Sequence, residues 1–288
     1  MILGLAQMQI AWEDKQSNKK CVRDLVEAFA GMCKQMTDEE VSATSPDTSF
    51  PLLAFPEMTL TGFSMNTSKT RDDEEETISF CRELANTYQI AIGIGRVVRS
   101  EGDALCENRY TIVAPPGVLL DYAKLHPFSY AGETEYFKGG NHLGVCEMDD
   151  FHIGCAICYD LRFPELFRRL ADEAELVLVP ANWPAERSHH WRILLAARAV
   201  ENRCYVAGVN CVGETGGLHY SGDSGLYGPD GSLLEPKHKI SNGENEASCI
   251  LVYEISNNIQ KLRDEFPVLK DKHPEDFIHM KIEKWTTS

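Results

Sequence analysis

Residues 151–170 read FHIGCAICYDLRFPELFRRL, and this stretch decides the fold class. Its first half is apolar with small residues, which is typical of a buried strand. Its second half reads as a helix from Pro164 onward, with the proline at a tolerated first-turn position. A strand that passes through a short turn into a helix is the repeating unit of α/β proteins. Cys158 falls at that turn, three residues after Cys155.

The same alternation extends to both sides of this stretch. Four segments have helical patterns, and the short apolar runs between them have strand patterns, so the sequence predicts an α/β fold. The helices are expected at 17–34, 77–88, 164–173 and 188–203, and the strands at 2–9, 51–57, 89–98, 109–115, 151–157, 175–181, 204–212 and 247–254. A PDG turn predicts a hairpin over 225–236, so part of the sheet should be antiparallel. Residues 37–49 read as a surface loop, and 1–288 as a single domain.

Composition excludes several classes of partner. The 288 residues are 43% hydrophobic and 25% charged, with a formal net charge of −16. Phosphate binding needs a basic surface, so nucleic acid is not an expected partner, and an anionic substrate would need local cations. No run approaches the ~18 apolar residues of a membrane span. The start, MILGLAQMQIAWED, reads as a strand, and the ten scattered cysteines read as reduced thiols, so we expect a cytoplasmic protein.

Cys158 is the candidate nucleophile. On a strand-to-helix turn its side chain projects outward, and the partial positive charge of the helix start favours a thiolate and a developing oxyanion. By strand alternation, Cys155 should face the core. Two alternatives remain open: both thiols are buried and inert, or the CxxC pair serves a metal or redox site. The second signal is weak, because a structural zinc site needs four ligands.

Two further stretches favour the nucleophile. Glu57 ends an apolar strand in LLAFPEM, and Lys124 follows a strand in LLDYAKLHPF. Buried charges at such positions need a partner or a function. Together with Cys158 they suit amide hydrolysis: Glu57 takes the thiol proton and returns one to ammonia, while Lys124 lowers the thiol pKa and holds the oxyanion. The backbone N–H of Tyr159 would assist Lys124.

The stretches AFPEM, AKLHPF and GCAICYDLRFPEL, in this order, resemble the nitrilase, or carbon–nitrogen hydrolase, superfamily. The resemblance runs through nearly the whole chain, from GLAQMQI to RDEFPVLKD. It implies a four-layer α-β-β-α sandwich that needs no cofactor or metal. It also implies a second glutamate that supports Lys124. Glu133 and Glu135 both follow the lysine, and we favour Glu133.

The stretches CYDLRFPEL and ANWPAERSHHW resemble the omega-amidase branch. This resemblance implies hydrolysis of the ω-amide of short dicarboxylic acid monoamides, such as 2-oxoglutaramate and 2-oxosuccinamate. Arg187 is the candidate for the substrate's free carboxylate, with a surface arginine as the alternative. Asn182 and Trp183 are expected to line the pocket, although Trp183 suits the core equally well. We expect Arg162 to brace the turn through Asp160.

Other functions stay open at this point. Within the superfamily they are a nitrilase, an N-carbamoyl amidohydrolase and a deaminated-glutathione amidase. Outside it, they are a thiol-based metal or redox protein and an inactive relative that serves as an interaction module. The resemblance also implies a homodimer that packs through outer helices. Residues 256–288 would form a C-terminal arm that crosses to the partner subunit, or a tail that packs on its own subunit.

Overall fold

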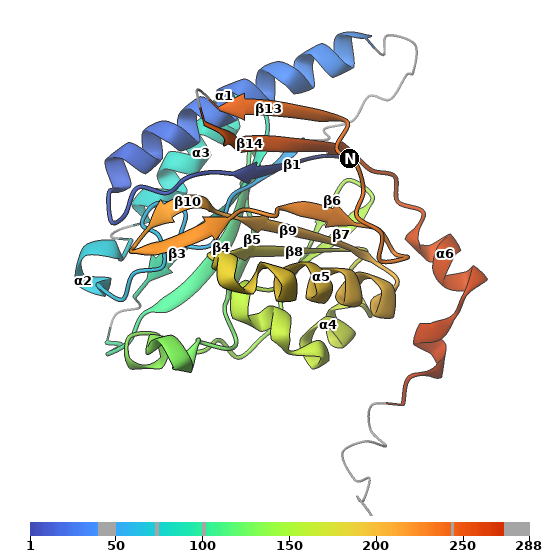
Figure 1. Cartoon of the computed structure of the whole chain (residues 1–288). Helices are drawn as coiled ribbons and strands as arrows, with labels where there is room; N and C mark the ends of the chain where they lie inside the picture. Colours follow the sequence, from blue (N-terminus) through green and yellow to red (C-terminus); the bar gives the residue numbers. More distant parts are fainter. Residues whose placement is uncertain (40–49, 73–74, 100–101, 243–244, 274–288) are drawn as a thin grey trace, which may run out of the picture.

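The computed structural model describes residues 1–39, 50–72, 75–99, 102–242 and 245–273. Two sheets lie face to face, and helices cover the outer face of each, as Figure 1 shows. The expected four-layer α-β-β-α sandwich is therefore confirmed.

The larger sheet has seven strands in the order β13-β14-β1-β2-β3-β4-β5. Strands β1, β2 and β3 are parallel, and the remaining pairs are antiparallel, so β5 runs in the same direction as β3. The strand bounds are β1 Ile2–Gln7, β2 Leu52–Ala54, β3 Ala91–Val98, β4 Glu107–Ala114, β5 Gly117–Ala123, β13 His238–Asn242 and β14 Asn245–Glu254.

The smaller sheet has five strands in the order β12-β9-β8-β7-β6, with β7, β8 and β9 parallel. A separate antiparallel pair, β10 and β11, follows β9. The strand bounds are β6 Val145–Met148, β7 Phe151–Cys155, β8 Leu176–Ala181, β9 Tyr205–Asn210, β10 Val212–Thr215, β11 Leu218–Ser221 and β12 Gly225–Tyr227.

Three apolar clusters fill the three spaces between the layers. One joins the two sheets, one lies under α1 and α3, and one lies under α4 and α5. Strand alternation divides β1 between two of them: Leu3 and Leu5 face the other sheet, while Ala6 faces α1. The helices are α1 Lys15–Glu39, α2 Thr67–Thr70, α3 Glu76–Tyr88, α4 Pro164–Leu170, α5 Ser188–Asn202 and α6 Ile259–Glu265, with 3-10 turns η1 Ser129–Ala131, η2 Glu133–Glu135, η3 Cys158–Arg162, η4 Ala185–Arg187 and η5 Val268–Asp271.

Several predicted boundaries differ from the structure. The strand expected at 51–57 ends at Ala54, because Pro56 has no N–H with which to continue the ladder. The hairpin expected over 225–236 keeps one strand, β12, and a single bridge between Tyr227 and Leu233. Helix α1 continues into the expected loop as far as Glu39, and the rest of that loop, 40–49, lies outside the described residues.

The C-terminal segment begins along its own subunit. The Arg263 guanidinium donates to the carbonyls of Ala174 at 3.0 Å and Arg203 at 3.1 Å. These contacts hold α6 beside the layer that contains α4 and α5 (Figure 1). Residues 274–288 of the expected arm lie outside the described residues. Its course to a partner subunit therefore remains a prediction.

Candidate active site

The site lies where strand ends from both sheets meet. Strands β2 and β5 run in the same direction, and Glu57 and Lys124 follow their carboxyl ends. In the facing sheet, Cys158 and Asn182 follow the ends of the parallel strands β7 and β8. The carboxyl ends of parallel strands are the usual ligand-binding edge of α/β proteins.

Cys158 is the first residue of η3, on the strained turn that follows β7. Its φ of +48° is in the left-handed region, which is uncommon for a residue with a Cβ. Such strain persists only where the surroundings hold it, and it is concentrated at functional sites. Tyr159 is the second residue of η3, a position at which the backbone N–H ordinarily lacks a helical partner. Cys155 is fully buried between the sheets, as predicted.

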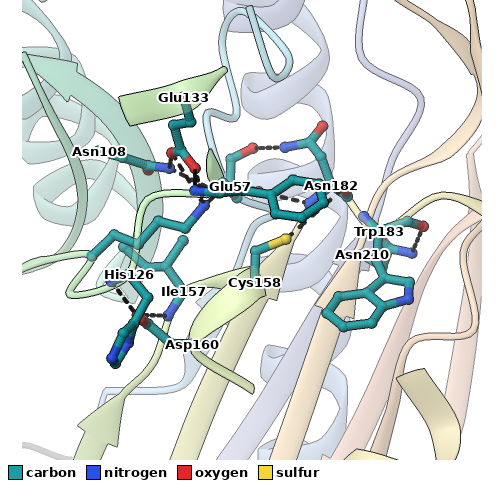
Figure 2. A network of polar contacts seen from close by, with 12 residues as sticks. Glu57, Asn108, His126, Glu133, Ile157, Cys158, Asp160, Asn182, Trp183 and Asn210 are labelled. Carbon is teal, nitrogen blue, oxygen red and sulfur yellow. Dashed lines mark hydrogen bonds and ion pairs between the residues drawn. The ribbon is translucent and has the colours of Figure 1, made fainter. Parts of the chain in front are cut away.

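The Asp160 carboxylate stabilises this turn by hydrogen bonds. One of its oxygens accepts from the Ile157 N–H at 3.0 Å and from the Tyr122 hydroxyl at 2.8 Å. The other accepts from the backbone N–H of His126 at 2.9 Å and contacts its Nδ1 at 2.8 Å (Figure 2). The carboxylate therefore ties the Cys158 turn to the segment that follows Lys124.

Arg162 does not brace the turn through Asp160, so that expectation is wrong. Its guanidinium lies 4.8 Å from the Trp183 ring and 3.5 Å from Nδ1 of His190. In the tight helix η3, side chains two residues apart point in different directions. Asp160 faces the interior, and Arg162 faces a cavity beside Cys158.

Lys124 joins two buried glutamates. Its Nζ lies 2.9 Å from Oε1 of Glu57 and 2.9 Å from Oε2 of Glu133. Glu133 is fully buried and Glu135 is exposed, so Glu133 is the acid that contacts the lysine. Glu133 also accepts from the backbone N–H of Phe128. The three side chains come from positions 57, 124 and 133, and only the fold unites them.

Burial and charge set the protonation of this group. Burial acts to raise the pKa of Glu57, but Lys124, Asn108 and the Asn182 N–H lower it below its ordinary value. Burial opposes the charge of Lys124, yet Glu57 and Glu133 raise the lysine pKa above its ordinary value. The structure therefore favours an ionised Glu57 beside a charged Lys124.

Cys158 rests as a thiol, which corrects the expectation of a thiolate. Burial raises its pKa well above the ordinary value, and the Glu57 carboxylate raises it further. Lys124 lowers this pKa, as predicted, but its effect is outweighed. Because Glu57 is ionised and close enough to raise the thiol pKa, the arrangement can move a proton from sulfur to carboxylate during an attack.

Asn182 fixes the position of Glu57. Its backbone N–H donates to Oε2 of Glu57 at 2.9 Å, and its side-chain amide donates to the Glu57 carbonyl at 2.6 Å. The thiol of Cys211 donates to the Asn182 side-chain oxygen at 3.3 Å. The Asn182 carbonyl lies 4.0 Å from Sγ of Cys158. Asn182 thus contacts both the acid and the thiol and also reaches the cavity.

Gly95 on β3 lets the Glu57 segment approach the sheet. A Cβ at this position would lie 2.3 Å from the backbone nitrogen of Met58 and 2.8 Å from the carbonyl carbon of Glu57. Both atoms belong to the main chain, so neither can rotate away. A side chain at this position would have to push Glu57 toward the cavity.

Gly95→Ala should therefore weaken both fold and activity. We expect a loss of about 1–3 kcal/mol in the free energy of unfolding, as for other overpacked sites. Hydrolysis should fall by about 10²-fold, because displaced reacting groups lose alignment. Chemical denaturation and the hydrolysis rate measure these effects. Gly31→Ala is the control, since its Cβ on α1 meets no atom within 4 Å and should not reduce stability. Equal behaviour of the two variants would contradict the prediction.

A cavity of about 310 Å³ opens above Cys158 and Lys124. Trp183 is both core and cavity wall: its ring packs on Trp191 and its indole N–H donates to the Arg187 carbonyl at 2.8 Å. Both interpretations of Trp183 are thus correct. The other lining residues are mostly aromatic or apolar, and they include Phe63, Phe128, Tyr130, Tyr159, Leu218 and Tyr220.

Arg187 and Arg162 bring two guanidinium groups to this cavity. Arg187 lies 5.9 Å from the Phe128 ring, and neither arginine forms an ion pair with any acid that the structure describes. In a chain of net charge −16, unpaired cations beside a candidate nucleophile suit an anionic ligand. Arg187 was expected here. Arg162 was missed because its place after Asp160 suggested a local ion pair.

Asn108 was also missed. Its amide nitrogen lies 2.7 Å from Glu57 and 3.1 Å from Glu133. The available signal was alternation along β4, because Asn108 shares a strand face with the buried Tyr110 and Ile112. A polar residue on a core-facing position needs a partner.

The described part of the chain shows no metal-binding cluster, no disulfide and no membrane-spanning helix. No three or more His, Cys, Asp or Glu side chains gather there in a way that could hold a metal ion. All ten cysteines are free thiols. None of the helices in the described ranges is both long and apolar enough to cross a membrane.

A carbon–nitrogen hydrolase family model matches residues 2–264. The chain is 34% identical over 270 residues to omega-amidase YafV of Yersinia enterocolitica, covering 93% of this chain and 95% of the relative. It is 28% identical over 223 residues to 2-oxoglutaramate amidase of Bacillus subtilis, covering 76% of this chain and 84% of the relative.

The fold also matches a solved structure. XC1258 of Xanthomonas campestris, a carbon–nitrogen hydrolase superfamily protein with an arsenic adduct in its active site, superposes with a TM-score of 0.77. The two chains are 29% identical, and the match covers 95% of this chain and 97% of that one. The sequence motifs, the layered fold and these relatives agree, and the chain is a hydrolase that acts on carbon–nitrogen bonds. This chain belongs to the carbon–nitrogen hydrolase family.

Proposed function

We propose that this enzyme releases ammonia from the ω-amide of short dicarboxylic acid monoamides, such as 2-oxoglutaramate and 2-oxosuccinamate. The observation that carries the proposal is one cavity that is lined by Cys158, Lys124 and Arg187. The base suits amide chemistry, and the arginine suits a free carboxylate at the other end of the substrate. Relatives named omega-amidase and 2-oxoglutaramate amidase support the same substrate class.

The first half-reaction forms a thioester. Glu57 takes the thiol proton as Sγ of Cys158 attacks the amide carbon. The carbonyl oxygen becomes an oxyanion, which the charge of Lys124 and the N–H of Tyr159 stabilise. Glu57 then returns the proton to the amide nitrogen, the carbon–nitrogen bond breaks, and ammonia leaves.

The second half-reaction hydrolyses the thioester. Glu57, ionised again, takes a proton from a water molecule as the water oxygen attacks the acyl carbon. The carbon–sulfur bond then breaks, Cys158 regains its proton from Glu57, and the dicarboxylic acid leaves. Glu133 takes no proton in this scheme. It keeps Lys124 charged and aimed between the two acids.

Arg187 accounts for the preference for a carboxylate. Its guanidinium can bind a carboxylate with two parallel hydrogen bonds. Arg162 supplies a second positive charge to the same cavity, and Asn182 and Trp183 form part of its wall. An uncharged amide of similar length would fit the apolar lining but would gain nothing from these arginines.

The proposal also includes a cytoplasmic homodimer that packs through its outer helices. Helix α5 supports this assembly, because Ile193 and Val200 on its surface are 51% and 45% exposed. Exposed apolar side chains on one helix suit a contact between copies of the chain. Light scattering in solution measures the mass of the assembly.

A substrate panel with ammonia detection tests the function. We expect 2-oxoglutaramate and 2-oxosuccinamate to react with a higher kcat/KM than butyramide, which lacks the carboxylate. Faster turnover of a nitrile, an N-carbamoyl amino acid or deaminated glutathione would contradict the proposed substrate class within the family.

Arginine variants sharpen the same test. Arg187→Gln should raise KM for 2-oxoglutaramate by about 10- to 100-fold, as expected for a lost charged hydrogen bond, and leave butyramide kinetics unchanged. Arg192→Gln is the control, because that arginine is exposed on α5 and contacts Ser188 outside the cavity. Equal losses for both substrates with Arg187→Gln would assign this arginine a structural role.

A further inference from the structure

Asn108 bridges the two acids of the site. The residue lies in β4 and is 1% exposed. Its Nδ2 is 2.7 Å from Oε1 of Glu57 and 3.1 Å from Oε1 of Glu133 (Figure 2). A side-chain amide nitrogen carries two hydrogens, so Asn108 can donate one to each carboxylate. It is a second bridge between the acids, parallel to the one that Lys124 makes.

The orientation of the Asn108 amide costs free energy, which its two hydrogen bonds to the acids must offset. Oδ1 of Asn108 is buried and has no hydrogen-bond partner in the described part of the chain. If the amide were turned over, this oxygen would face two carboxylate oxygens, and neither of them can donate a hydrogen. The amide thus leaves its own acceptor unsatisfied in order to donate twice to the acids.

Asn108 also positions the lysine through the main chain. Its carbonyl accepts a hydrogen bond from the Lys124 N–H at 2.8 Å. The main chain of Asn108 therefore supports the cation, while its side chain holds both anions. Since β4 is a central strand between β3 and β5, this residue has little freedom to move.

The charge balance of the site explains why a neutral donor is useful. Glu57 and Glu133 share the single ammonium of Lys124, which leaves one excess negative charge. Another cation would compete with Lys124 for the acids, whereas an amide stabilises both ionised carboxylates without changing the net charge. The Asn108 hydrogen bond is among the causes that lower the pKa of Glu57.

We infer that Asn108 is a positioning residue: its amide joins Glu57 to Glu133 and keeps Glu57 ionised and directed at the thiol of Cys158. The inference rests on the proposed amidase function, in which Glu57 takes the thiol proton. Asn108 is not among the residues that line the cavity, so it acts through Glu57 and not on the substrate.

Asn108→Leu removes both donors and keeps a similar volume. Without this hydrogen bond the pKa of Glu57 rises, so the low-pH limb of kcat/KM should move to higher pH by about one unit. At neutral pH, kcat should fall by about tenfold, with little change in KM, because the acid loses alignment while the cavity wall stays intact.

A second measurement needs no substrate. Iodoacetamide alkylates Cys158, and mass spectrometry of the digested protein follows this modification as a function of pH. The alkylation rate should rise with pH along the same ascending limb as kcat/KM, because the thiol gives up its proton to Glu57. In Asn108→Leu, this limb should move to higher pH by an amount similar to the shift in kcat/KM. An intact protein that releases no ammonia from any ω-amide but shows this shift would contradict the proposed function and keep the inference.

Asn108→Asp guards against misfolding of the leucine variant. The aspartate has nearly the same shape but adds a third acid beside Glu57 and Glu133. We expect a larger upward shift of the ascending limb than for Asn108→Leu, because like charges raise the pKa of neighbouring carboxyl groups. An unchanged limb in either folded variant would overturn the inference.

Asn202→Leu is the matched control. Asn202 is also fully buried, its Nδ2 donates to the Arg198 carbonyl at 2.9 Å, and its Oδ1 also lacks a partner among the described residues. It lies at the end of α5, away from the acids. The variant should lose stability but keep the wild-type pH midpoints. A shift as large as that of Asn108→Leu would show that the midpoint reports stability, and the inference would fail.

Discussion

Replacing Cys158 with alanine should reduce ammonia release by about 10⁴-fold or more, with the fold intact. The sulfur is the only protein atom that bonds to the amide carbon in the proposed mechanism, and water attacks that carbon only after the thioester has formed. Glu57, Lys124 and Glu133 keep the hydrogen bonds that join them to one another in this variant, because none of these involves the sulfur. Ammonia release and far-ultraviolet circular dichroism measure the two parts of this expectation.

Cys155→Ala is the matched control for the nucleophile. Cys155 is three residues earlier and fully buried between the sheets. Its replacement should cost about 1 kcal/mol of stability through lost packing and leave kcat nearly unchanged. Substantial turnover by Cys158→Ala, or complete loss with a folded Cys155→Ala, would contradict the assignment of the nucleophile.

Replacing Lys124 with methionine should have the largest effect on stability. The change keeps the length of the side chain but leaves Glu57 and Glu133 buried without their cation. Breaking a buried ion pair in this way costs about 3–5 kcal/mol, because an uncompensated charge stays in the interior. Hydrolysis should also fall by about 10²- to 10³-fold, since the oxyanion loses its positive charge.

The stability loss should depend on pH in a defined direction. In the wild type, the lowered pKa of Glu57 adds stability above its unfolded value of 4.5, and this contribution disappears as pH falls through the folded pKa. In Lys124→Met the carboxyl pKa values rise above their unfolded values. The loss in the free energy of unfolding is then largest at neutral pH, and it disappears as the acids take up protons.

Denaturation curves at pH 7.5 and pH 5 measure this dependence. The difference in the free energy of unfolding between wild type and Lys124→Met should be smaller at pH 5 than at pH 7.5. Lys138→Met is the control, because this partly exposed lysine pairs with Asp103 at 2.7 Å near the surface, and its loss should change stability little at either pH. A gap independent of pH would show that Lys124 acts through packing and not through charge.

Part of the site was predictable because local chemistry reveals it. Glu57 and Lys124 are charged residues at the ends of apolar strands, and such residues need a partner wherever they fold. Cys158 falls between a strand pattern and a helix pattern, so its place on a turn follows from the neighbouring residues. The resemblance to known motifs then added the preference for Glu133 over Glu135.

The errors have a common cause. The thiolate was expected from the helix start and Lys124, but desolvation by the surrounding protein and the Glu57 carboxylate outweigh both. Arg162 was paired with Asp160 because the two are near in sequence, yet Asp160 turns inward to Tyr122 and His126. In both cases the competing interaction comes from a distant segment, whose approach no local pattern reveals.

The amino-acid sequence by itself determined the α/β class, the approximate strands and helices, and the three charged or nucleophilic groups, because hydrophobic periodicity and turn chemistry are local properties. Only the tertiary structure decided which groups meet: Asn108 with two acids, Arg162 with the cavity, and Cys158 with an ionised Glu57. Two stacked sheets bring strand ends from positions 57, 124, 158 and 182 to one edge. The burial there sets the protonation that the chemistry needs, and burial belongs to the folded chain as a whole.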